Sequence, residues 1–239
     1  MRTSIFAFAT DFADEGLEAV LDNVTDRGRV EGVTVAAVYH DGRDLFPHNP
    51  VQKVRFLEGG AHFFRPDQDA YRDLRIQPHV SALAQERDVV AELCAAARER
   101  DLEVHAWTVF LHNDTLGVRH PECAPRNAFG DAYVTDLCPA NTHVRAYVRA
   151  LAGDIVSLGV TSVLTESLHY HPLEHGYAHE RYFIDLGPLS RYLLGLCFCA
   201  DCLKAARRHG VDGEGVCAFA RAELERVFAH AGRRSRAMT

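Results

Sequence analysis

Four short apolar runs, separated by segments with helical spacing, constrain the fold of this chain more than any other feature. The runs are rich in β-branched and small apolar residues, as in strands buried on both faces; they cover 4–9, 33–39, 104–110 and 160–165. Helices are predicted over 11–28, 87–100, 141–156, 200–209 and 215–231. Strands that alternate with helices form parallel βαβ units, so an α/β fold is predicted.

Long irregular segments follow the second and third predicted strands, at 40–85 and 111–138. Loops of this kind at the carboxyl ends of strands favour a (β/α) TIM-type barrel over an open, doubly wound sheet. No Gly-x-Gly-x-x-Gly follows the first strand, which weakens a dinucleotide-binding interpretation. Only four strong strands are recognised, so we expect an incomplete barrel, its N-terminal half to two-thirds, in one domain over 1–231 with a flexible tail at 232–239.

Charge and hydropathy narrow the classes of partner. The 239 residues carry a formal net charge of −7 at pH 7, which argues against general binding of nucleic acid or of anionic membranes. No apolar run is long enough to span a bilayer. The first apolar run is soon followed by Asp11, Asp14 and Glu15, so we interpret it as a strand rather than a signal peptide and expect a cytoplasmic protein.

Glu166 directly follows the fourth predicted strand. In a barrel this position points into the mouth of the active site, where a carboxylate can serve as a general acid or base. A salt-bridged or helix-capping glutamate is the structural alternative. We predict Glu166 as the catalytic group.

Histidines crowd the segment after Glu166. His169 and His171 are predicted to contact substrate hydroxyls, because imidazole both donates and accepts hydrogen bonds. His175 and His179 are four residues apart and could instead share a helix face and bind a metal. Exposed histidines of a polar loop are the third interpretation.

Three cysteines form the pattern Cys197-x-Cys199-x-x-Cys202. This spacing suits a structural zinc site, whose fourth ligand would be Cys217 or a nearby histidine. A redox pair at a helix N-terminus and a set of buried thiols remain alternatives. Zinc is thus the one metal that the sequence suggests, and the predicted reaction requires no cofactor.

Several of these segments resemble the glycosyl-hydrolase-like TIM-barrel family, which is distantly similar to α-amylase-type and β-galactosidase-type barrels. The resemblance rests on four segments: 58–63, 106–109 leading to His112 and Asn113, the turn 138–141, and Glu166. It extends over about residues 4–212. It implies a hydrolase with two carboxylates flanking a glycosidic bond, in which Glu166 is the general acid/base. The second carboxylate would be Glu174, Glu180 or Asp185. The spacing of these residues does not select one of the three.

These observations predict a glycoside-hydrolase-like protein acting on a carbohydrate, with His62, His112, Asn113, His169 and His171 lining the substrate site. One alternative is a metal-dependent barrel hydrolase or isomerase, with His169, His171, His175 and Glu166 as ligands. Another is an inactive barrel fragment or sugar-binding module. We expect a small-molecule carbohydrate as the partner, no nucleic acid and no membrane, and the sequence leaves homo-oligomer formation open.

Overall fold

The computed structural model describes residues 2–171, 173–174 and 179–236. The contacts between its residues divide the chain into two compact units. The first contains residues 1–115 and 146–168, and the second contains 116–145 and 169–239. The sequence predicted one barrel-like domain over 1–231, and this division assigns the histidine and cysteine segments to the second unit and the predicted strands to the first.

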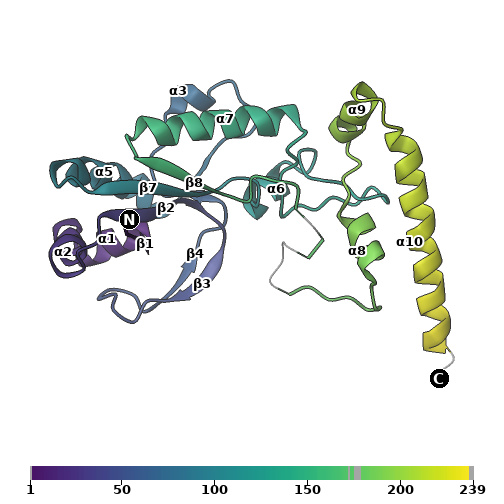
Figure 1. Cartoon of the computed structure of the whole chain (residues 1–239), viewed down its shortest axis with the longest axis horizontal. Coiled ribbons are helices and arrows are strands. Elements are labelled where there is room, and N and C mark those ends of the chain that lie inside the picture. Colours follow the sequence, from purple (N-terminus) through teal and green to yellow (C-terminus); the bar gives the residue numbers. More distant parts are fainter. Residues whose placement is uncertain (1, 172, 175–178, 237–239) are drawn as a thin grey trace. The chain divides into compact units, whose positions relative to one another are not determined.

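The first unit is built on four parallel strands that follow one another in chain order (Figure 1). They are β1 (Ser4–Ala7), β2 (Gly32–Tyr39), β7 (Glu103–Val109) and β8 (Ser162–Glu166), with β1 beside β2, β2 beside β7 and β7 beside β8. These are the four predicted strands, so the α/β class is confirmed. Among the described residues the sheet does not close into a barrel.

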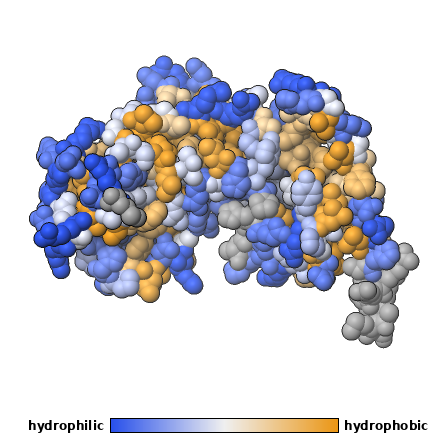
Figure 2. All heavy atoms as spheres, viewed as in Figure 1, coloured by the Kyte–Doolittle hydropathy of each residue, from blue (hydrophilic) through white to orange (hydrophobic). Residues whose placement is uncertain are grey.

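Helices follow these strands as the sequence predicted. The helical segment after β1 is divided into α1 (Ala9–Glu15), α2 (Leu17–Asp22) and the π-helix η1 (Asn23–Arg27). Gly16, with φ of 91°, separates the first two, because this backbone conformation suits glycine and interrupts a right-handed helix. The helix α5 (Val89–Glu99) packs on β7, and hydrophilic side chains cover the outer surface of α2 and α5 (Figure 2).

The helix α7 (Thr142–Ser157) matches the helix predicted over 141–156 to within one residue at each end. The Oδ1 atom of Asn141 accepts hydrogen bonds from the backbone N–H groups of His143 and Val144, at 2.9 and 3.2 Å. This satisfies donors that the first helical turn leaves without a partner. The predicted helix start is therefore confirmed.

The segment 40–85, predicted to be irregular, contains short elements. They are β3 (Gly42–Leu45), β4 (Val54–Leu57), β5 (Ala61–His62), α3 (Gln68–Tyr71), β6 (His79–Val80) and α4 (Ala82–Glu86). β3 and β4 form an antiparallel hairpin, and β5 pairs antiparallel with the end of β2. Strands of two to four residues have too little periodicity to be recognised in the sequence.

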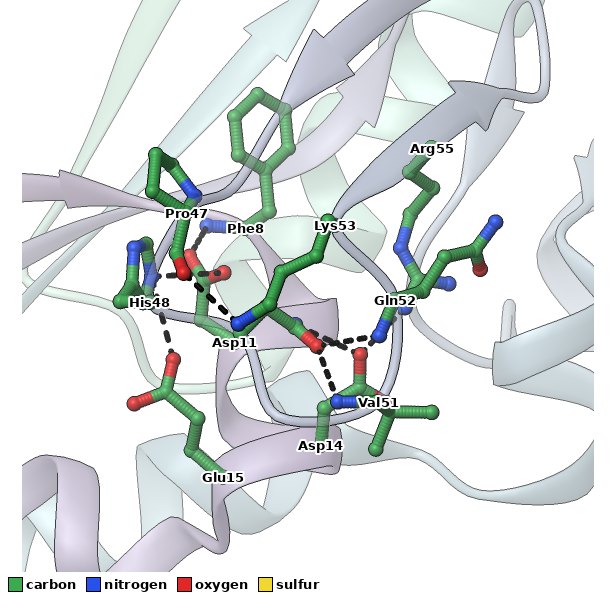
Figure 3. A network of polar contacts seen from close by, with 11 residues as sticks. Phe8, Asp11, Asp14, Glu15, Pro47, His48, Val51, Gln52, Lys53 and Arg55 are labelled. Atoms are coloured by element: carbon green, nitrogen blue, oxygen red, sulfur yellow. Dashed lines mark hydrogen bonds and ion pairs between the residues drawn. The ribbon is translucent and has the colours of Figure 1, made fainter.

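A polar network attaches the turn of the β3–β4 hairpin to α1 (Figure 3). The buried side chain of Asn49 donates to Asp14 at 2.8 Å, and Arg55 pairs with the same carboxylate. His48 lies 3.2 Å from Glu15. The hairpin is therefore held against the helix that follows β1, beside the carboxyl ends of the strands.

The second unit is mainly helical. Its elements are α6 (Asp114–Arg119), which begins in the first unit, α8 (Pro188–Gly195), α9 (Ala200–Arg208) and α10 (Gly213–Arg236). A small apolar core joins α8 to α10; its buried members are Ala128, Leu186, Leu193, Leu194, Ala220 and Leu224. Within the described ranges, no helix has the length and hydrophobicity needed to cross a bilayer.

The predicted flexible tail at 232–239 overlaps the last helix. The helix α10 continues to Arg236, and the flexibility of the tail stays a prediction. Residues 237–239 lie outside the described part of the chain.

Candidate functional site

Glu166 is the last residue of β8 and lies on one face of the sheet together with Trp107 of β7. The register places Trp107 opposite Leu164, two residues before Glu166, so all three side chains share a face. The indole Nε1–H of Trp107 donates a hydrogen bond to Oε2 of Glu166. Both side chains are partly exposed, so the carboxylate is oriented by the indole while it remains open to solvent.

Aromatic rings from the neighbouring strands surround Trp107. Its ring lies 5.1 Å from that of Phe6 and 4.5 Å from that of Tyr39, in edge-to-face geometry. The ring of Phe8 lies 5.3 Å from that of Tyr39 and 5.6 Å from that of Phe46, which directly follows β3. We call this set, Phe6, Phe8, Tyr39 and Trp107, the aromatic face. It lies at and near the carboxyl ends of three parallel strands, and Phe6 remains 60% exposed.

Two carboxylates act on the phenol of Tyr39. Burial raises the pKa of Tyr39 to about 12, and the charges of Glu166 and then of Asp44 add to the effect. Asp44 comes from the β3–β4 hairpin and Glu166 from β8. The aromatic face is therefore bordered by a carboxylate from each of two separate elements, and Tyr39 stays protonated as a hydrogen-bond donor near neutral pH.

The backbone after Glu166 has an unusual conformation. Ser167 is buried and has φ of 55°, which is uncommon for a residue with a side chain. The backbone N–H groups of Phe110 and Leu111 donate to the carbonyls of Glu166 and Ser167 at 3.0 and 3.2 Å. These bonds hold the strand end, and the local strain lies at the residue next to the candidate catalytic group.

His62, predicted to bind substrate, lies instead in the core of the first unit. Its side chain is fully buried, and Nε2 shares a 2.9 Å hydrogen bond with the hydroxyl of Tyr147. Burial lowers the pKa of His62 to about 3, and the nearby His79 contributes in the same direction. We therefore correct this assignment: the imidazole is a neutral core group, because a fully buried ring cannot reach a ligand.

Asn113 also has a structural position rather than the predicted substrate contact. It is 1% exposed, and its Nδ2 donates to the carbonyl oxygen of Gly60 at 3.3 Å. Gly60 has φ of 63°, and a Cβ atom there would lie 2.0 Å from Asn113 Oδ1. The amide of Asn113 thus packs directly against Gly60 in the turn before β5. Only glycine can occupy this position without displacing the amide.

His112 lies near the carboxyl ends of the strands, as predicted. Its ring is 5.7 Å from that of His40, which in turn stacks on Tyr39 at 4.2 Å. All three side chains are partly exposed. The position is compatible with a substrate contact, which stays a prediction.

His169 and His171 belong to the second unit, where their rings lie 4.8 Å apart. The Nδ1 atom of His171 pairs with Asp136, and both side chains are largely buried. His169 is exposed. His175, a predicted metal ligand, lies outside the described residues. Substrate contact by His169 and His171 remains a prediction.

The three predicted zinc ligands meet a fourth cysteine, Cys138. Its Sγ atom lies 3.8 Å from that of Cys197 and 3.6 Å from those of Cys199 and Cys202. All four sulfurs lie within 4.8 Å of one another. The sequence left Cys217 or a nearby histidine open as the fourth ligand, but the Sγ atom of Cys217 contacts the carbonyl of Ala128, at 3.8 Å.

Cys138 was missed because it is 59 residues from Cys197 and forms no C-x-x-C pair of its own. Its only local signal was a cysteine followed by proline at the end of a long loop. Isolated cysteines of this kind are common as buried small side chains, so the sequence does not distinguish a ligand from a core residue.

No family model matches this sequence, and no curated protein sequence does. Similarity is found among solved structures. The chain resembles an α-L-fucosidase isoenzyme 2 from Paenibacillus thiaminolyticus at a TM-score of 0.52 and 14% identity, over 98% of this chain and 30% of that one. It resembles a hypothetical protein from Ruminiclostridium thermocellum at 0.51 and 13%, over 68% of this chain and 75% of that one.

A third similarity, to a noncanonic maltogenic α-amylase from Thermotoga neapolitana, has a TM-score of 0.44 and 16% identity. It covers 72% of this chain and 40% of the amylase, and at this TM-score it bears no weight. The chain thus spans less than half of the length of either named enzyme. At these identities the first two similarities show a shared fold and nothing about activity.

Proposed function

We propose that this chain is a glycoside-hydrolase-like protein whose first unit consists of consecutive β/α units of a (β/α) barrel. In this proposal it binds a carbohydrate at the carboxyl ends of the strands, with Glu166 as the group that transfers a proton. One observation carries the proposal: Glu166 ends a parallel strand beside the aromatic face and is oriented by the indole of Trp107. The fold similarity to an α-L-fucosidase is in keeping with it.

The chemistry of a sugar suits this surface. A pyranose ring has an apolar C–H face and a rim of hydroxyl groups, so it can stack on an indole or phenol ring while its hydroxyls bond to polar groups. Oε2 of Glu166 accepts from Trp107, so the indole orients the carboxylate. Oε1 would then exchange a proton with the glycosidic oxygen, as a general acid/base does.

Glycosidases use a second carboxylate, and Asp44 is the best candidate in the first unit. Its charge acts on Tyr39 together with that of Glu166, from the hairpin that the network of Figure 3 holds in place. The sequence-based candidates Glu174, Glu180 and Asp185 are exposed residues of the second unit. Glu174 pairs with Arg191, and Glu180 accepts from Tyr182.

The test is turnover of a panel of aryl glycosides by the full chain and by Glu166→Gln. We expect the variant to lose about 10²–10⁴-fold in kcat/KM, because the amide cannot transfer the proton. Glu103→Gln is the matched control, since Glu103 lies in β7 next to His105, at the amino end of the same sheet. Equal turnover by Glu166→Gln and the wild type would disprove the catalytic role.

Binding is measured separately through Trp107, the only tryptophan of the chain. Titration with mono- and oligosaccharides should change its fluorescence, because the indole lies within the proposed site. Saturable binding without turnover on any glycoside would favour the sugar-binding module over the hydrolase. If no sugar changes the emission of Trp107 or shields the aromatic face from a quencher in solution, the proposal fails as a whole.

A further inference from the structure

The four-cysteine cluster lies entirely in the second unit and has no part in the proposed sugar chemistry. Its sulfurs come from two places in the chain. Cys138 precedes α7, and the other three cysteines lie at or just before the first turn of α9. The cluster thus joins two helix starts that are about 60 residues apart in the sequence.

The sulfur separations identify the kind of site. Disulfide sulfurs lie about 2.05 Å apart, so the 3.6–3.8 Å distances from Cys138 to each partner exclude a disulfide in this arrangement. Four sulfurs at about 2.3 Å from one ion in tetrahedral geometry are separated by about 3.8 Å. The observed separations therefore match thiolates that share a single tetrahedral ion.

The surroundings suit negatively charged sulfur. The backbone N–H of Arg126 donates to Cys197 Sγ at 3.4 Å. Cys199 is the N-cap residue of α9, so it lies at the positive end of the helix dipole. Each of these contacts stabilises a thiolate more than a thiol.

The cluster also lies where it can attach α9 to the rest of the second unit. No residue of α9 is fully buried, so the apolar core alone gives this helix little anchorage. A second link joins the same two segments: Asn141 Nδ2 donates to Asp201 Oδ2 at 2.9 Å. Small units with a limited core commonly depend on a metal or disulfides for stability.

We propose that Cys138, Cys197, Cys199 and Cys202 bind one zinc ion that holds the starts of α7 and α9 together. Four protein ligands complete a tetrahedral shell, so the ion is structural and leaves no position for water or substrate. A polynuclear iron–sulfur cluster does not fit, because cysteines bound to different irons lie further apart than these sulfurs. Zinc is preferred by four thiolates among redox-inert ions.

The test is elemental analysis of the full chain purified without chelator and without added metal. We expect one zinc per chain in the wild type and close to none in Cys138→Ser. Cys217→Ser is the matched control, because Cys217 lies in the same unit and its sulfur contacts a carbonyl rather than the cluster. Iron in place of zinc, or zinc retained by Cys138→Ser, would overturn the proposal, as would equal loss in Cys217→Ser.

Cobalt substitution of the wild type avoids dependence on a variant that may not fold. Co²⁺ in the zinc-free chain should give intense sulfur-to-cobalt charge-transfer bands and the visible bands of tetrahedral coordination, and one equivalent of Zn²⁺ should abolish both. The weak spectrum of octahedral cobalt, or fewer than four thiols protected from alkylation by zinc, would contradict a four-thiolate site.

Discussion

Burial is the main cause that keeps the imidazole of His62 neutral in the folded chain. Its pKa is lowered to about 3, first by burial and second by His79, whereas an imidazole in the unfolded chain titrates near 6.5. As the pH falls, the unfolded chain takes up a proton at this position before the folded chain does. The stability that neutral His62 contributes is therefore complete above about pH 6.5 and is lost as the pH falls from there toward 3.

We predict that His62→Gln reduces the acid sensitivity of the first unit. Between about pH 6 and pH 4 the free energy of unfolding of the wild type should fall more steeply than that of the variant, by up to about 1.4 kcal/mol per pH unit. Urea unfolding followed by Trp107 fluorescence measures this. His209→Gln, at an exposed position, should keep the wild-type slope, and identical slopes for all three proteins would refute the prediction.

At the scale of single elements, the turn before β5 and the helix α7 each contain a glycine, in opposite situations. Gly60 has a positive φ and lies against Asn113, so an added Cβ meets both backbone strain and a buried side chain. Gly153 lies on the exposed side of α7, and nothing lies within 4 Å of where its Cβ would be. The same substitution should therefore have opposite effects at the two positions.

We predict that Gly60→Ala lowers the free energy of unfolding by about 2 kcal/mol or more, because the residue must leave its conformation or displace Asn113. Gly153→Ala should raise it by about 0.5–1 kcal/mol, because alanine is the better helix former. Thermal and urea unfolding of both variants test this pair. A neutral Gly60→Ala would mean that the turn and the amide relax at little cost.

At the scale of the whole molecule, the two units are stabilised by different means. The first has a sheet whose central strand β2 is buried along nearly its full length. The edge strands β1 and β8 remain partly exposed, with Ile5 at 46% and Leu164 at 43%. The second unit has a small apolar core and, in our proposal, a zinc ion.

If that proposal holds, removal of zinc should affect the second unit first. After zinc is displaced with a mercurial reagent and chelated, we expect early proteolytic cleavage within 169–236 and a loss of helical circular dichroism, while Trp107 emission changes little. Mass spectrometry of the first fragments locates the cleavage. Simultaneous loss of both signals would show that the two units unfold as one.

The sequence by itself determined the four strands, the helices between them and the place of Glu166. These depend on local periodicity and on runs of β-branched residues, which arise from the backbone geometry of each element. Glu166 could be found because a residue that directly follows a parallel strand lies at the carboxyl edge of the sheet wherever that strand packs.

Only the tertiary structure decided which of the remaining candidates can meet a ligand or a metal. His62 and Asn113 are polar in the sequence yet buried in the fold, because distant segments, among them α7 with Tyr147 and the turn at Gly60, pack against them. Cys138 joined the other three cysteines from 59 or more residues away, where no local pattern marked it. Contacts between segments far apart depend on how the whole chain packs, and short-range spacing carries no information about them.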